Sequence, residues 1–108
     1  MSYNVEETIR LSQLFDIYQE LLTEKQKEYF GYYFLDNYSL SEIAEILNVS
    51  RNAVHLQIKN IVTNLESFEQ KLKVHELNKQ VDNLLEALKS ESLSDKTNSL
   101  IKRIEKVK

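Results

Sequence analysis

The chain contains almost none of the residues that interrupt helices: it has no proline, and Gly31 is its only glycine. Proline and glycine are the strongest breakers of regular backbone structure. The sequence therefore predicts an all-α protein. A length of 108 residues suits a single domain, and 42% hydrophobic with 29% charged residues is typical of a soluble globular chain rather than a disordered one.

Several classes of site are excluded by composition and spacing. The chain has no cysteine, which rules out disulfides and thiolate metal sites and fits a reducing cytoplasm, where we expect the protein. The N-terminus has no long apolar run, so we expect neither a signal peptide nor a membrane span. His55 and His75 are too far apart to share a metal, and no phosphate-binding glycine loop or nameable Ser–His–Asp arrangement is present. We expect no metal, no cofactor and no enzymatic activity.

Residues 39–54 form a predicted helix-turn-helix unit, complete in its start and stop signals. Ser39 and Glu42 have the spacing of a capping box at the start of a short helix. Asn48 falls where the chain must turn through a left-handed conformation, and Ser50 can cap the second helix. We expect the short helix to turn Ile43, Ala44, Ile46 and Leu47 inward, with Val49 filling the space between the two helices.

Two further helices are predicted before this unit. The first spans about residues 4–22, and the second opens at a capping box of Thr23 and Gln26. The apolar face of the first helix consists of Leu11, Leu14, Phe15, Tyr18, Leu21 and Leu22. Gly31 lies inside the second helix at a cost of roughly 1 kcal/mol relative to alanine, which suggests close contact with a neighbouring helix. Phe30, Tyr33 and Phe34 share one face of this helix, which favours core packing over base stacking. Tyr32 points elsewhere and is a candidate contact.

A long helix is predicted from Arg51 to Leu72, and a second apolar pattern follows it. The apolar stripe of the long helix consists of Val54, Ile58, Ile61, Leu65, Phe68 and Leu72. The phase of the apolar stripe slips after Leu72, so residues 73–76 hold a bend, a break or a stutter. The polar residues 90–94 precede a final basic amphipathic segment, which could dock on an acidic partner, RNA or a membrane surface or pack on its own domain. We expect a helix-turn-helix domain over residues 1–72 and a helical extension over 73–108, for dimerisation or partner docking. The new stripe consists of Leu77, Val81, Leu84 and Leu88. It is either part of an intramolecular core or a surface on which two copies pair, and our hypothesis is the pairing surface of a homodimer.

The outward side of the long helix is the surface that a recognition helix would offer. Asn52 can bond bidentately to adenine, and Arg51 or Lys59 can reach phosphate or guanine. Charge argues against tight, nonspecific DNA binding, because the chain carries a net −3 and residues 1–38 hold seven acids against three bases. The predicted outward residues are Asn52, His55, Leu56, Lys59 and Thr63, with Arg51 at the flank.

Three short segments of the sequence resemble segments of known families: Leu-Thr-Glu-Lys-Gln, Asp-Asn-Tyr-Ser-Leu-Ser-Glu-Ile-Ala and Val-Ser-Arg-Asn-Ala-Val-His. Over residues 10–75 the chain resembles region four of bacterial sigma factors. It resembles more closely the YlxM-like family, small helix-turn-helix proteins of Gram-positive bacteria and mollicutes. The resemblance implies that the candidate nucleic-acid contacts are Ser50, Arg51, Asn52, His55 and Lys59.

The same resemblance implies a regulatory or accessory protein of the signal recognition particle pathway, with the particle's GTPase or RNA as partner. In the family this link rests largely on a gene position beside the genes for the particle's GTPases. One alternative is a DNA-binding transcriptional regulator. Another is a dimeric adaptor whose helix-turn-helix contacts only protein.

Overall fold

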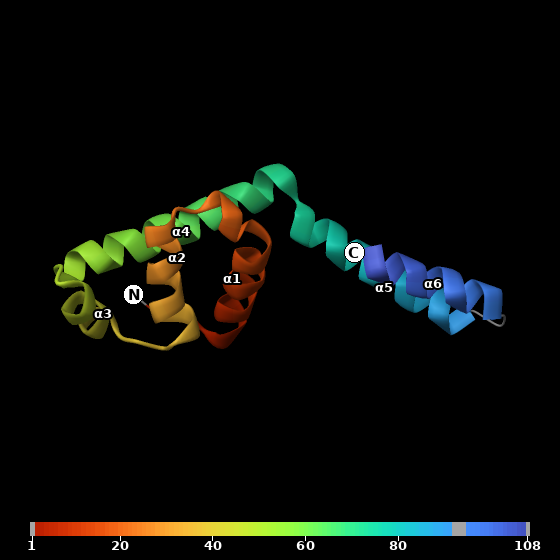
Figure 1. Cartoon of the computed structure of the whole chain (residues 1–108), viewed down its shortest axis with the longest axis horizontal. Helices are drawn as coiled ribbons and strands as arrows, with labels where there is room; N and C mark the ends of the chain where they lie inside the picture. The colour runs from red at the N-terminus through yellow and green to blue at the C-terminus, as the bar shows by residue number, and fades with distance from the viewer. Residues whose placement is uncertain (1, 92–94, 108) are drawn as a thin grey trace. The chain divides into compact units, whose positions relative to one another are not determined.

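The computed structural model describes residues 2–91 and 95–107, and every regular element in those two stretches is helical, which confirms the all-α prediction (Figure 1). The chain divides into two compact units, Met1–Leu72 (unit 1) and Lys73–Lys108 (unit 2). The elements of unit 1 are α1 (Val5–Tyr18), a 3₁₀ turn (Gln19–Leu21), α2 (Glu24–Phe30), a π-helical segment (Gly31–Leu35), α3 (Leu40–Leu47) and α4 (Arg51–Leu72). Unit 2 contains α5 (Val74–Glu91) and α6 (Asp95–Val107).

Helix α4 is the element on which unit 1 is built, because α1, α2 and α3 all pack against it (Figure 1). The predicted apolar stripe of α4 is fully buried over most of its length, at Val54, Ile58, Ile61 and Leu65. Its last predicted member, Leu72, is exposed. The stripe therefore serves the core of unit 1 only as far as the helices that pack on it reach.

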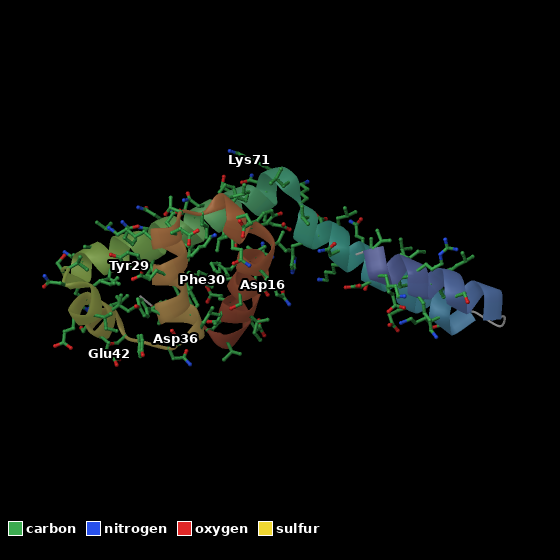
Figure 2. The ribbon with its side chains drawn as sticks, in the orientation of Figure 1. Asp16, Tyr29, Phe30, Asp36, Glu42 and Lys71 are labelled. Atoms are coloured by element: carbon green, nitrogen blue, oxygen red, sulfur yellow. The ribbon has the colours of Figure 1, made fainter. Side chains whose placement is uncertain are left out.

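Phe30 and Phe34 of the second helix lie in the core, as predicted, whereas Tyr33, predicted on the same face, is only half-buried. Phe30 stacks on Phe15 of α1 with ring centroids 4.2 Å apart, and Phe34 lies 4.6 Å from Phe30. Figure 2 shows Phe30 between α2 and α1. Tyr29 is 1% exposed. Tyr32 lies beside Tyr38, with the ring centroids 5.7 Å apart.

Two details of the first two helices differ from the prediction. The end of the first helix tightens into the 3₁₀ turn, and this change of phase leaves Leu21 exposed while Leu22 is buried. Gly31 has ordinary helical angles, and a Cβ added to it would meet no atom within 4 Å, so the predicted close helix contact is wrong. The backbone instead widens after Gly31, where the Asp36 N–H donates to the Gly31 carbonyl at 2.9 Å.

The phase slip after Leu72 corresponds to a break between helices. Lys73 adopts a left-handed conformation with φ 53°, and α5 begins at Val74. The second interruption, predicted over residues 90–94, falls partly on residues 92–94, which lie outside the described residues; α5 continues to Glu91.

Helices α5 and α6 of unit 2 lie side by side (Figure 1). Leu85 and Ile101 are buried, and Lys89 Nζ lies 3.1 Å from Glu105 Oε1. The stripe predicted for α5 included Leu84 and not Leu85. Within this chain Leu84 is 65% exposed, and Leu85 is the residue that is buried.

Candidate nucleic-acid interface

The first helix of the helix-turn-helix unit is fixed by its N-terminal cap. Ser39 Oγ accepts a hydrogen bond from the Glu42 N–H, and Glu42 Oε1 accepts one from the Ser39 N–H, each at 3.0 Å. This is the predicted capping box, and the bond from the Ser39 backbone lowers the pKa of Glu42 below its usual value. Figure 2 places Glu42 on the outer side of α3. The start of α3 is therefore set by contacts within four residues of sequence.

The turn and the start of α4 also follow the prediction. Asn48 adopts the left-handed conformation, with φ 55° and ψ 49°. The Val49 N–H donates to the Ala44 carbonyl at 3.0 Å, and Ser50 Oγ accepts a bond from the Ala53 N–H at 3.0 Å. Ser50 thus caps α4, which begins at Arg51 as expected.

The apolar contacts between α3 and α4 are fewer than predicted. Ile43 and Val54 are fully buried, and Ala44 and Leu47 are partly buried. Ile46 is 49% exposed and Val49 is 36% exposed, so the predictions that Ile46 faces inward and that Val49 fills the space between the two helices are wrong. The buried residues of α3 are therefore Leu40 and Ile43 alone.

The residues predicted as nucleic-acid contacts lie on the N-terminal half of α4 and its cap. Ser50, Arg51, Asn52 and Lys59 are exposed, and His55 is half-buried. We call these five residues the α4 face. Two further residues predicted to point outward, Leu56 and Thr63, are also exposed, and Thr63 Oγ1 donates to the Lys59 carbonyl at 2.9 Å. The α4 face thus offers two cations, an amide, a hydroxyl and an imidazole.

Unit 1 has four basic residues besides Arg51 and Lys59, and two of them are held in ion pairs, whereas Lys25 and Lys71 are exposed outside the α4 face. Arg10 donates from Nε and Nη2 to the two carboxylate oxygens of Glu66, at 3.1 and 3.0 Å. Lys27 Nζ lies 3.1 Å from Glu24 and 3.8 Å from Glu20. Arg51 and Lys59, in contrast, make no ion pair with any described residue. Residues 1–72 hold eleven acidic against six basic residues, so the α4 face presents its two cations on a unit of charge −5.

Two features of unit 1 were missed by sequence reasoning. A cavity of about 200 Å³ has aromatic walls that include Tyr3, Tyr33 and Tyr38, and burial raises the pKa of Tyr3. Tyr3 precedes the first helix, so periodicity gave no sign of it. Glu69 of α4 is 8% exposed and accepts a 2.7 Å hydrogen bond from the Tyr18 hydroxyl. The one available signal was its position four residues after Leu65, on the buried stripe.

Residues 2–91 and 95–107 contain neither a cluster of metal ligands nor a helix suited to a membrane. No three histidine, aspartate or glutamate side chains there are grouped as metal ligands would be. No helix in the same stretches has both the length and the apolar character needed to cross a bilayer.

The family of the chain is shown by its match to a known sequence profile. The sequence profile described as "Putative helix-turn-helix protein, YlxM / p13 like", of the UPF0122 family, matches residues 5–107. The chain belongs to this family. The match includes α5 and α6, so the UPF0122 profile extends beyond residues 10–75, to which the resemblance was limited. The family description gives a fold and names no reaction.

Curated UPF0122 relatives match over most of their length. The UPF0122 protein of Shouchella clausii is 45% identical over 107 residues, covering 95% of this chain and 98% of the relative. A UPF0122 protein of an Exiguobacterium species is 45% identical over 102 residues, with 94% and 95% covered. That of Oceanobacillus iheyensis is 48% identical over 85 residues, covering 79% of this chain and 81% of the relative.

Proposed function

We propose that this UPF0122 protein is a regulatory or accessory factor of the signal recognition particle pathway that binds the particle's RNA through the α4 face. The observation that carries the proposal is the placement of Ser50, Arg51, Asn52 and Lys59, which are all exposed at the start of the second helix-turn-helix helix. The pathway itself is inferred from the family resemblance, whose link to the particle is the position of the gene.

The charge of unit 1 favours a small contact with RNA over a long contact with duplex DNA. The two cations of the α4 face, on a unit of net charge −5, can neutralise about two phosphates. DNA-binding proteins of high affinity commonly make roughly 6–10 phosphate contacts. A structured RNA with unstacked bases offers hydrogen-bonding edges and a 2′-hydroxyl to Asn52, Ser50 and His55, so its recognition depends less on total charge.

A DNA-binding transcriptional regulator is the second candidate. It is favoured by Arg51 and Asn52, which occupy the first turn of α4, where helix-turn-helix proteins contact base edges. A protein adaptor is the third, favoured by the exposed Ile46 and Leu56, which lie on the two helices of the unit.

The first experiment separates these partners. The full chain is used as bait in a host lysate, with and without nuclease, and the eluate is assayed for particle RNA, particle GTPase and genomic DNA. Nuclease-sensitive recovery of particle RNA supports the proposal. Enrichment of promoter DNA instead would favour the transcriptional regulator, and nuclease-resistant recovery of the GTPase without RNA would favour the adaptor.

The second experiment tests the α4 face directly, with purified particle RNA as the probe. Replacing both Arg51 and Lys59 by alanine should reduce the slope of log affinity against log salt by up to about 2 units. The matched control replaces Lys25 and Lys71, two exposed lysines outside the α4 face, and should leave the slope nearly unchanged. Equal losses in the two double variants would contradict the assignment of the α4 face.

A further inference from the structure

Unit 2 contains an open apolar groove between its two helices. The groove has a volume of about 710 Å³, and Arg103 contributes a charged group to its lining. The apolar walls are formed by Leu77 and Val81 of α5 and by Leu100, Ile104 and Val107 of α6. Four of these five side chains are at least 45% exposed in the single chain, and Val81 is half-buried.

The apolar surface of α5 continues beyond the groove. Leu84 is 65% exposed and Leu88 is 44% exposed. In contrast, Leu85 and Ile101 are the only apolar side chains buried among the residues of unit 2 whose burial the structure describes. A unit of 36 residues with so small a core does not reach independent stability without oligomerisation, a metal or a disulfide. The chain has no cysteine for a disulfide, and its described residues contain no cluster of metal ligands, so association with another protein surface remains as the way to cover the apolar face.

The charges of the two helices indicate what covers them. By sequence, α5 holds four acidic and two basic residues, a net charge of −2, whereas α6 holds two acidic and four basic residues, a net charge of +2. A two-fold axis that places α5 of one copy beside α6 of another brings opposite charges together at both edges of the interface. A partner whose surface carried charges of only one sign would complement only one of the two helices.

We propose that unit 2 is a dimerisation unit, in which the apolar faces of α5 and α6 in two copies pack as a four-helix bundle with α5 of each copy beside α6 of its partner. The seam includes the predicted stripe of Leu77, Val81, Leu84 and Leu88, and α6 adds Leu100, Ile104 and Val107. The proposal is independent of what the α4 face binds. It gives the assembly two helix-turn-helix units.

The test is sedimentation equilibrium of the full-length chain. The parent should be a dimer, and Leu84→Glu and Ile104→Glu should each raise the dissociation constant by at least about 100-fold, because each places two carboxylates in the apolar seam. The matched control is Asn83→Glu, which adds the same charge at an exposed polar position of α5 and should leave the dimer intact. All six tyrosines lie in residues 1–72, so an unchanged near-ultraviolet circular dichroism spectrum shows that unit 1 remains folded in each variant.

A charge reversal tests the pairing of α5 with α6. Arg103→Glu should weaken the dimer about 10-fold more than Lys25→Glu, an identical change at an exposed site of unit 1. Equal effects of these two substitutions would overturn the pairing. A monomeric parent at high micromolar concentration, or a dimer that survives both Leu84→Glu and Ile104→Glu, would overturn the dimerisation unit itself.

Discussion

At the scale of single residues, the buried carboxylate of Glu69 joins α4 to the end of α1. Transfer of a charged group from water into a protein interior is costly unless hydrogen bonds replace the lost hydration. The Tyr18 hydroxyl supplies one such bond at 2.7 Å, and the Tyr18 ring lies 6.0 Å from that of Phe68. Tyr18 therefore contributes both apolar packing and a polar partner at the same contact.

We predict that Tyr18→Phe, which keeps the ring and removes the hydroxyl, lowers the free energy of unfolding by about 1–3 kcal/mol. The loss arises because the buried carboxylate of Glu69 gives up a short hydrogen bond. Urea unfolding followed by far-ultraviolet circular dichroism measures the change. Tyr32→Phe is the control, since Tyr32 is only half-buried, and should stay within about 0.5 kcal/mol of the parent. Equal stability of the two variants would show that the Tyr18 bond adds nothing.

At the scale of elements, α3 depends on its capping box because it has only eight residues. Isolated helices of that length are unstable in water. The box satisfies two backbone N–H groups, and the carboxylate form of Glu42 also interacts favourably with the N-terminal end of the helix. The lowered pKa of Glu42 shows that folding favours this charged form.

A pH dependence follows from that pKa. Since the folded pKa of Glu42 is below the unfolded value of 4.5, its charge stabilises the fold above that value. The stabilisation is lost as the pH falls through the folded pKa. Glu42→Gln keeps a capping side chain but cannot titrate. We expect the parent to be more stable than Glu42→Gln at neutral pH and the difference to shrink on acidification, measured by urea unfolding at a series of pH values. A difference that is constant across the acidic range would contradict the role of the charge.

How far an element could be predicted depends on the range of the contacts that define it. The capping boxes, the left-handed Asn48 and the start of α4 are fixed by groups within a few residues, and the sequence predicts them correctly. Ile46 and Val49 were assigned wrongly because their burial depends on how much of α3 the neighbouring helices cover. The reason proposed for Gly31 failed in the same way, since a helix contact is a tertiary property. For the α4 face, periodicity predicted the exposed side, whereas the partner is set by surfaces that the chain does not contain.

At the scale of the whole molecule, the two units differ in charge and in core. The net charge of −3 divides into −5 for residues 1–72 and +2 for residues 73–108. Unit 1 holds fourteen of the sixteen buried apolar side chains found in the described part of the chain. A continuous core of that size, with ring stacking between α1 and α2, supports folding without help from another chain. Among the residues of unit 2 whose burial the structure describes, only Leu85 and Ile101 are buried apolar side chains.

The units should therefore behave differently when they are separated after Leu72. We expect residues 1–72 to fold as a monomer that retains the near-ultraviolet circular dichroism of the full chain and unfolds cooperatively in urea. Residues 73–108 should be largely unfolded when dilute and should gain helix as the concentration rises, because their apolar face is covered only by association. The same peptide carrying Leu84→Glu serves as the control, and its helicity should stay low at every concentration. Helicity of the parent peptide that is high and independent of concentration would mean that Leu85 and Ile101 suffice as a core and that α5 and α6 need no second copy to fold.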